Sequence, residues 1–495
     1  MASLPQALYT VEQARALDRI AIQDFGIPEI VLMERAGRAA FAHLHTRWPQ
    51  AERIVVVCGP GNNGGDGYIV ACAALEAGYR VAVVTLSPPT GASSKTALAA
   101  LDPAVVMPAE SFDAMLVGAD VIVDAVFGIG LKREIAGRWQ HYVDAINAAG
   151  VPIVAIDIPS GLDSDSGAVH GVAVRATLTV TFIGLKLGLL TGAGREHVGE
   201  VACADLGLPE SVYEQVDVAA KRITTSHVQT NRPMRSRAAH KGRSGHVVII
   251  GGNHSMLGAA RMAGEAAYRS GAGLVTVATR PEHAALLSAA RPELMSKAAQ
   301  DASDLDDILE RATVVAIGPG LGRDDWAQQL WRRVLERDGP MVVDADALNA
   351  LAQGPFQRDD WVLTPHPGEA ARLLSSTPAA VQSDRLAALE ALLRRYGGVG
   401  ILKGSGTLIG SADDMPALCD RGNPGMASGG MGDVLTGVIA GLIAQGLQLR
   451  IAAELGVWLH ASAADIAARD GGEMGMMAMD LLPPIRALIN NPNLT

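Results

Sequence analysis

Short apolar runs alternate with longer stretches of helical spacing through both halves of the chain. The runs are rich in Val and Ile and lack the polar alternation of half-exposed strands. Because near-continuous apolar strands separated by helices are typical of parallel sheets covered on both faces, the pattern predicts an α/β protein. The strands predicted in the first half are 54–58, 81–85, 121–124, 153–157 and 178–182. Those predicted in the second half are 247–250, 274–278, 314–317, 341–344, 361–364 and 400–403.

Helical patterns stand at both ends of the chain. Apolar spacing within 11–45 predicts two leading helices, and Thr10 and Gln13 occupy the two positions of a capping box. The second half ends in predicted helices at 432–445, 451–468 and 479–489.

The alternation stops between about 209 and 243, where polar and basic residues replace the strand signals. A chain of 495 residues is too long for one hydrophobic core, so we expect one domain at 1–220 and a second at 221–495. The first is expected to be a Rossmann-like three-layer α/β/α sandwich. No repeat relates the two halves, which indicates a fusion and not a duplication.

Composition narrows the classes of partner. Hydrophobic residues make up 49% and charged residues 19%, which suits a well-packed soluble protein, and the net charge of −11 disfavours nucleic acid. The four cysteines have no paired spacing, and no signal peptide or membrane span is recognisable. We therefore expect a cytoplasmic protein without nucleic-acid or membrane partners. A homo-oligomer is a separate expectation, which no residue pattern carries. One basic stretch, interpreted as a solvated linker, contains Arg232, Arg235, Arg237, His240, Lys241 and Arg243.

A glycine-rich segment, 59–67, lies between a predicted strand and a helix expected to begin near Tyr68. Backbone N–H groups and the helix dipole favour anion binding there. Gly59, Gly61 and Gly64 match the dinucleotide fingerprint, but the acidic residue that should follow the second strand is missing. An ordinary NAD-dependent dehydrogenase is therefore disfavoured.

Oxygen-bearing side chains gather near the same edge of the predicted sheet. Asn63 and Asp124 could coordinate a cation or orient a sugar or nicotinamide group. Asp124 and Asp157 each end a predicted strand, where open α/β sheets bind ligands. Capping of the following turn is at least as common a role for one isolated Asp, but the convergence with the glycine segment favours a ligand site.

Together with the motifs at 123–128 and 156–163, the glycine segment resembles the YjeF N-terminal domain, the NAD(P)H-hydrate epimerase family, over about residues 10–215. The resemblance implies potassium ligands at Asn63, Asp124 and Ser160 and an acid/base role for Asp157. Ile129 stands where the family usually has Thr. The implied substrate contacts are Asn62, Asn63, Gly64, Gly65, Asp66, Gly128, Ile129, Gly130, Leu131, Lys132, Arg133, Glu134 and Asp157.

A second glycine-rich segment, 423–433, leads into the predicted helix that begins around Val434. Its glycines could form a nest for a transferring phosphoryl group, and Asp433 could deprotonate an attacking hydroxyl. Alone, Asp433 could equally be a helix cap. Further segments at strand ends, 318–322, 364–369 and 403–407, favour a phosphate site, whereas His366 alone would be an ordinary loop histidine. The Walker pattern is absent, which excludes P-loop kinases.

These motifs resemble the ribokinase-like ADP/ATP-dependent NAD(P)H-hydrate dehydratase family over about residues 221–490. The resemblance implies a ribokinase-like α/β fold, ADP as co-substrate, Mg²⁺, and catalysis by Asp433. Met431 departs from a commoner Thr. The implied nucleotide contacts are Lys403, Gly404, Ser405, Gly406, Thr407 and Gly432. The implied substrate contacts are Ala259, Gly322, His366 and Asp433.

The two resemblances together imply repair of hydrated NADH and NADPH. The first half would interconvert the R and S epimers, and the second would dehydrate the S epimer with ADP, releasing AMP and phosphate. The partners would be the small molecules NADHX, NADPHX and ADP. The alternative is a vitamin-alcohol kinase fused to a non-catalytic nucleotide-binding module, and the intact segment 62–66 argues against it.

Overall fold

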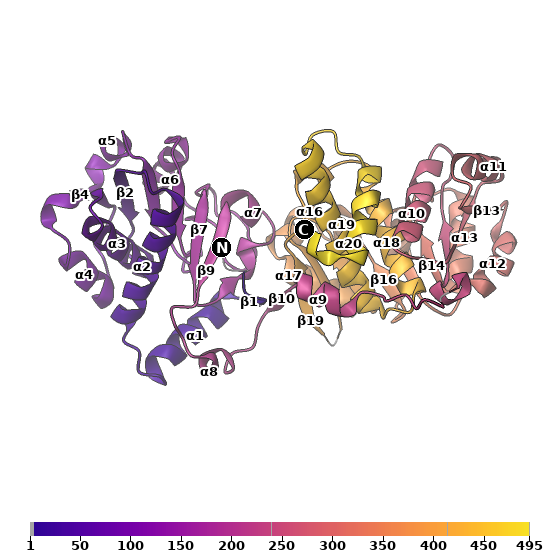
Figure 1. Ribbon diagram of the computed structural model, residues 1–495, viewed down its shortest axis with the longest axis horizontal. Coiled ribbons are helices and arrows are strands. Elements are labelled where there is room, and N and C mark those ends of the chain that lie inside the picture. Colours follow the sequence, from indigo (N-terminus) through magenta and orange to yellow (C-terminus); the bar gives the residue numbers. More distant parts are fainter. Residues whose placement is uncertain (1–3, 239, 413, 495) are drawn as a thin grey trace. The chain divides into compact units, whose positions relative to one another are not determined.

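The computed structural model describes residues 4–238, 240–412 and 414–494. The chain divides into two compact units, Met1–Lys221 and Arg222–Thr495, called here the N-terminal and C-terminal units (Figure 1). The division falls one residue after the predicted boundary.

The N-terminal unit contains a parallel sheet in the order β4-β3-β2-β5-β6-β7-β9. The two strands that the sequence pattern missed, β4 and β9, lack a continuous buried run, because each has half-exposed residues. The strands are β2 (Arg53–Cys58), β3 (Arg80–Thr85), β4 (Val106–Pro108), β5 (Val121–Ala125), β6 (Ile153–Ile156), β7 (Leu178–Phe182) and β9 (Glu200–Ala204). Short strands β8 (Leu185–Lys186) and β10 (Ala220–Arg222) flank β1 (Ala7–Tyr9).

Helices cover both faces of this sheet, as expected for a three-layer sandwich. Alternate residues of β2 point to opposite faces, so Ile54 joins one hydrophobic cluster and Val55 joins another. The predicted capping box of α1 is present, with Gln13 N donating to Thr10 Oγ1 over 3.3 Å. The helices are α1 (Val11–Gln23), α2 (Glu29–Arg47), α3 (Asn62–Glu76), α4 (Ala92–Ala99), α5 (Phe112–Leu116), α6 (Arg138–Ala148), α7 (Gly194–His197) and α8 (Glu210–Tyr213).

The C-terminal unit has strands in the order β13-β12-β11-β14-β15-β16-β17-β18-β19. The strands from β13 to β17 pair in parallel, and β18 and β19 then add antiparallel hairpins. The sequence pattern missed β13, β18 and β19. The strands are β11 (His246–Ile250), β12 (Leu274–Thr279), β13 (Met295–Ala298), β14 (Val314–Ile317), β15 (Met341–Val343), β16 (Trp361–Leu363), β17 (Val399–Leu402), β18 (Thr407–Ser411) and β19 (Asp414–Cys419).

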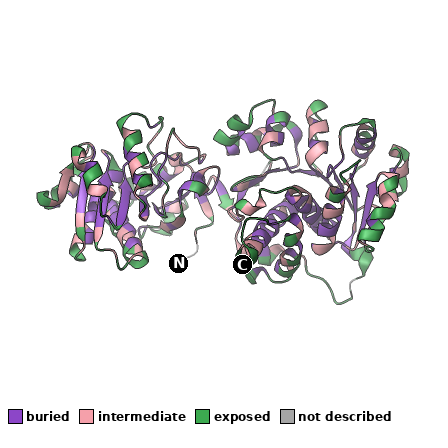
Figure 2. Cartoon of the chain, turned by 90° about the horizontal axis from the view of Figure 1, so that it is seen from above, coloured by how far each residue is buried: buried purple, intermediate pink, exposed green. Residues whose placement is uncertain are grey.

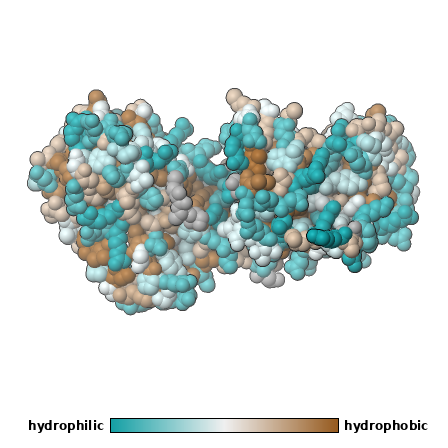
Figure 3. All heavy atoms as spheres, viewed as in Figure 1, coloured by the Kyte–Doolittle hydropathy of each residue, from teal (hydrophilic) through white to brown (hydrophobic). Residues whose placement is uncertain are grey.

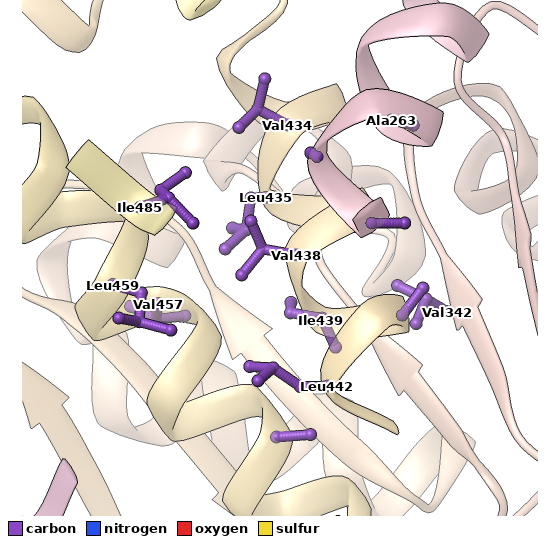
Figure 4. Packing of buried hydrophobic residues seen from close by; sticks show 14 of the residues in the cluster. Ala263, Val342, Val434, Leu435, Val438, Ile439, Leu442, Val457, Leu459 and Ile485 are labelled. Atoms are coloured by element: carbon purple, nitrogen blue, oxygen red, sulfur yellow. The ribbon is translucent and has the colours of Figure 1, made fainter. Parts of the chain in front are cut away.

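Helix α18 forms the centre of the C-terminal core, where Val434, Val438 and Leu442 pack among other buried residues (Figure 4). A Cβ atom on Gly437 would lie 2.0 Å from the carbonyl oxygen of Ala263, so glycine lets α18 lie directly against α10. The helices are α9 (Thr225–Asn231), α10 (Leu257–Arg269), α11 (Pro281–Ala290), α12 (Asp306–Arg311), α13 (Asp325–Leu335), α14 (Ala345–Gln353), α15 (Pro367–Leu373), α16 (Pro378–Ser383), α17 (Arg385–Tyr396), α18 (Met431–Ala444), α19 (Leu449–Gly471) and α20 (Leu482–Asn490).

Burial follows the layers of each unit. The central strands of both units are buried, whereas edge strands such as β4 and β13 are partly exposed, and the outer faces of the helices are exposed (Figure 2). The face seen in Figure 3 is largely hydrophilic, with scattered hydrophobic patches. Within the described part of the chain, no helix is both long enough and apolar enough to cross a membrane.

Candidate functional site

The parallel strands of the N-terminal unit end at a cavity of ≈ 770 Å³. Three of the residues predicted to contact substrate, Gly64, Gly65 and Glu134, are not among those that line it. The predicted residues that do line it are Asn62, Asn63, Asp66, Gly128, Ile129, Gly130, Leu131, Lys132, Arg133 and Asp157.

The segment 62–66 is the first turn of α3 and not a loop, so the helix start expected near Tyr68 was wrong. Close packing explains its glycines: a Cβ on Gly64 would lie 2.0 Å from the Gly59 carbonyl oxygen, and one on Gly65 would meet the Met33 side chain at 2.6 Å. The glycines bring the helix N-terminus against the edge of the sheet. Its free N–H groups therefore border the cavity, which suits an anionic or strongly polar ligand.

Asp157 lies directly after β6 and has a backbone φ of 64°, a conformation that non-glycine residues rarely adopt. Its carboxylate accepts hydrogen bonds from Lys186 Nζ at 2.5 Å and from Thr181 Oγ1 at 3.0 Å. Lys186 is almost fully buried, with 2% of its side chain exposed. A strained, charge-paired carboxylate on a cavity wall is a candidate for acid/base chemistry.

Three more carboxyl groups line this cavity, Asp18 of α1, Glu29 of α2 and Asp66 of α3. Burial, with a contribution from nearby Asp157, raises the pKa of Asp18 to about 6 and raises that of Asp66 as well. The sequence analysis missed Asp18 and Lys186. A signal for Asp18 was present, because it lies one helical turn from Ala14 on the buried face of α1.

Asn63, Asp124 and Ser160 form a buried polar cluster beside the cavity. The Asp124 carboxylate is fully buried and accepts from Ser160 Oγ at 2.6 Å and from Ser160 N at 2.8 Å. Burial raises the pKa of Asp124 to about 6. Both amide atoms of Asn63 are buried without a hydrogen-bond partner in the described structure. Such an orphaned amide indicates a missing ligand.

In the C-terminal unit, the strand ends bring together Asp344 and Lys403. Lys403 Nζ lies 2.8 Å from Asp344 Oδ1 and 3.8 Å from Glu369 Oε2. Burial opposes ionisation of Asp344, but the Lys403 ammonium outweighs it and lowers the pKa of this carboxyl. The sequence analysis missed Asp344, although it ends a predicted strand as Asp124 and Asp157 do.

Asp433 lies in the first turn of α18, which begins at Met431 and not at Val434 as expected. Burial, followed by repulsion from Asp344, raises the pKa of Asp433 to about 7. A Cβ built on neighbouring Gly432 would lie 3.4 Å from both Asp344 Oδ2 and Lys403 Nζ. The open space at this glycine therefore faces a cation and a helix N-terminus, an arrangement that can receive a phosphoryl group beside a carboxyl group.

The other predicted substrate residues lie on three neighbouring segments. His366 caps α15, its Nδ1 accepting from Gly368 N at 3.0 Å. Gly322 N donates to Asp346 Oδ2 at 2.9 Å, and Asp346 contributes to the raised pKa of Asp433. Ala259 of α10 lies beside the 318–322 turn, where a Cβ on Gly320 would meet its own Cβ at 3.2 Å.

The predicted nucleotide segment 403–407 is the turn of the β17–β18 hairpin. Buried Arg385 braces this turn: its NH2 donates to the carbonyl oxygens of Leu402 at 3.1 Å and of Lys403 at 3.3 Å. Thr407 Oγ1 donates to the Gly404 carbonyl oxygen at 2.9 Å. Arg385 was missed from sequence, since nothing in its neighbourhood distinguishes it from a surface arginine on a helix.

Comparison with known proteins gives matches for both units. A family described as NAD(P)H-hydrate dehydratase matches residues 247–486, and the YjeF-related protein N-terminus matches residues 29–188. The ADP/ATP-dependent NAD(P)H-hydrate dehydratase of Bacillus subtilis, crystallised with ATP and Mg²⁺, is 28% identical with a TM-score of 0.51. It covers 55% of this chain and 98% of its own. A ribokinase-like superfamily protein of Enterococcus faecalis is 31% identical, also with a TM-score of 0.51, over 54% of this chain and 95% of its own.

Curated relatives match both units together. The bifunctional NAD(P)H-hydrate repair enzyme of Coxiella burnetii is 50% identical over 98% of this chain and 99% of its own. That of Escherichia coli is 42% identical over 99% of this chain and 95% of its own. With a site at the strand ends of each unit, and with relatives at this identity over nearly its whole length, the chain belongs to the family of bifunctional NAD(P)H-hydrate repair enzymes.

Proposed function

We propose that the unit at 1–220 epimerises hydrated NADH and NADPH, and that the unit at 221–495 dehydrates the S epimer with ADP. One observation carries the second assignment: the Asp433 carboxyl, whose pKa is raised to about 7, lies beside an open glycine turn that faces Lys403. A carboxyl group with a pKa near the working pH is suited to accept a proton from a hydroxyl.

The dehydration chemistry follows from the poor leaving ability of hydroxide. Asp433 takes the proton of the substrate's ring hydroxyl as its oxygen attacks the β-phosphoryl group of ADP, and AMP leaves. Phosphate then departs with the C–O electron pair while a ring proton is lost, so the double bond re-forms. Mg²⁺, when bound to the phosphates of the nucleotide, would neutralise charge on the phosphoryl oxygens.

The nucleotide turn is proposed to act through its backbone as much as through its side chains. Lys403 is held by Asp344 and Glu369, so it presents a fixed positive charge near Gly432. Arg385 keeps the carbonyl groups of the turn directed away from the phosphates, because they accept its hydrogen bonds. Residues 404–407 would then approach the nucleotide.

In the epimerase unit, Asp157 is proposed to be the acid/base that moves the proton of the ring hydroxyl, with Lys186 fixing its orientation. Asn63, Asp124 and Ser160 suit potassium, because they offer an unpartnered amide oxygen, a carboxylate and a hydroxyl within one buried cluster. Potassium, when bound, would supply a positive charge beside the polar part of the substrate.

The decisive test mixes the full chain with the R and S hydrates of NADH, Mg²⁺ and either ADP or ATP. We expect the absorbance of NADH to return until both epimers are consumed, and to return faster with ADP than with ATP. Chromatography of the nucleotides should show AMP and phosphate formed in step with NADH. A stable phosphorylated organic product without NADH would support the vitamin-kinase alternative, which the family membership disfavours.

The dehydratase rate should depend on pH through Asp433. Because the base must be deprotonated and burial raises its pKa to about 7, kcat should rise about tenfold per unit below pH 7 and level off above it. Stopped assays with pure S epimer over pH 5.5–8.5, about the range in which histidine and shifted carboxyl groups titrate, would measure this profile.

Glu369 provides the matched control, since burial raises its pKa to about 7 too. Glu369→Gln keeps an acceptor for the backbone N–H of His366 but cannot titrate. The rising limb should persist in this variant. Its disappearance would assign the pH dependence to Glu369.

A further inference from the structure

A second cavity, of ≈ 630 Å³, opens in the C-terminal unit away from the strand ends. It lies where α10 ends at Arg269 and α18 ends at Ala444, whereas Asp433 begins α18. At 1.5 Å per residue, the cavity is roughly 18 Å along the helix from Asp433. A ligand here would not occupy the dehydratase site.

The lining of this cavity is basic in an otherwise acidic chain. The charged residues in its wall are Arg232, Arg235, Arg269, Arg291 and Arg486, opposed by Glu265 and Glu293. Glu265 is already engaged, because its carboxylate meets Arg261 Nε at 2.8 Å and Arg291 NH2 at 2.5 Å. The guanidinium groups in the wall therefore outnumber the carboxylates by three.

Two of the arginines have a structural explanation. Arg232 NH1 donates to the carbonyl oxygen of Asn490 at 2.9 Å, and Arg235 NH2 donates to that of Gly271. They thus cap chain segments at helix ends, where the dipole favours cations. Arg232 and Arg235 belong to the basic stretch that the sequence analysis interpreted as a solvated linker.

The other arginines are not explained by such contacts. The guanidinium groups of Arg269 and Arg486 form no hydrogen bond or ion pair with any part of the chain that the structure describes, although the Arg486 carbonyl oxygen accepts from Asn490 Nδ2 at 2.7 Å. The Nε atom of Arg291 is buried without a hydrogen-bond partner. A buried donor without a partner destabilises the fold, and a bound acceptor would remove that penalty.

We infer that this cavity binds an oligophosphate anion, either free or carried by a nucleotide. Guanidinium groups match phosphate oxygens in geometry and remain charged. The volume lies within the range of about 300–1,000 Å³ typical of small-molecule sites and exceeds what one phosphate needs. The exposed rim, with Met234 and Ile489, leaves room for a nucleoside.

Calorimetric titration of the full chain with inorganic pyrophosphate tests the site. We expect saturable binding, weakened about tenfold or more in Arg269→Gln/Arg486→Gln, because two charge-assisted contacts are lost. Arg332→Gln/Arg394→Gln removes two exposed charges from the same unit outside the cavity and should bind as the parent does. Unfolding temperatures of both variants should match the parent, since none of the four guanidinium groups has a hydrogen bond or ion pair with the described residues.

A third variant separates this cavity from the nucleotide site. Gly432→Val fills the space beside Lys403 and should leave pyrophosphate binding intact. On that background, tighter binding of ADP than of pyrophosphate would identify a nucleotide as the ligand, and equal binding would identify the free anion. Loss of binding in Gly432→Val, parent-like binding in Arg269→Gln/Arg486→Gln, or no saturable binding at all would overturn the inference.

Discussion

Asp433→Asn should abolish the return of NADH from the S epimer while leaving R and S in rapid exchange. The carboxamide keeps the shape of the side chain but cannot accept the hydroxyl proton, so we expect kcat to fall about 10²–10⁴-fold. Absorbance of NADH measures the dehydratase, and chromatographic separation of the epimers measures the exchange in the same sample.

Asp346 supplies the matched control for this substitution. It lies close enough to raise the pKa of Asp433, and Asp346→Asn retains an acceptor for the N–H of Gly322. We expect Asp346→Asn to change kcat of the dehydratase by less than about tenfold. The apparent pKa of Asp433 should fall, because one neighbouring negative charge is removed. If Asp433→Asn regenerates NADH at the parent rate, the proposed phosphorylation mechanism is wrong.

Asp157→Asn should produce the opposite failure. In a mixture of epimers with excess ADP, the S form should disappear quickly while the R form persists, with the catalysed exchange slowed about 10²–10⁴-fold. Asparagine is preferred to alanine, because its amide oxygen can still accept the hydrogen bond from the buried ammonium of Lys186. An unchanged dehydratase rate shows that the C-terminal unit remains folded, and an unchanged unfolding temperature would show the same for the N-terminal unit.

Asp18→Asn distinguishes the role of Asp18 from that of Asp157 within this cavity. Asp18 has a pKa raised to about 6 but lacks the strained backbone and the short contact with Lys186 that mark Asp157. We expect Asp18→Asn to shift the pH profile of exchange and to keep most of its rate. Loss of exchange in Asp18→Asn with normal exchange in Asp157→Asn would transfer the acid/base role to Asp18.

Lys403 also has a buried carboxylate as its partner, which affects the choice of substitution at this position. The sequence suggests a phosphate contact that alanine would simply remove, but the structure pairs this ammonium with Asp344, which is 2% exposed. Lys403→Ala would therefore leave a buried carboxylate without its partner. A rise in the nucleotide KM of that variant would therefore combine lost binding with lost stability. Gly432→Val tests nucleotide binding more directly, because it leaves the pair of Lys403 and Asp344 in place.

The central strands of both sheets could be predicted from the sequence because each is a continuous apolar run. Strand β4 has only three residues, and the half-exposed β9 and the hairpin strands β18 and β19 carry no comparable signal. A carboxylate at the end of a predicted strand can also be recognised in the sequence. Asp124 and Asp157 were recognised in this way, and Asp344 could have been recognised in the same way. Lys186 and Arg385 could not, because their importance depends on burial and on partners distant in sequence.

Each chain carries one epimerase unit and one dehydratase unit, Met1–Lys221 and Arg222–Thr495. Translation therefore delivers the two sites in a fixed ratio of one to one, whatever the level of expression. The balance between exchange of the epimers and dehydration of the S form is then set by the ratio of the per-site rate constants, and not by the relative expression of two genes.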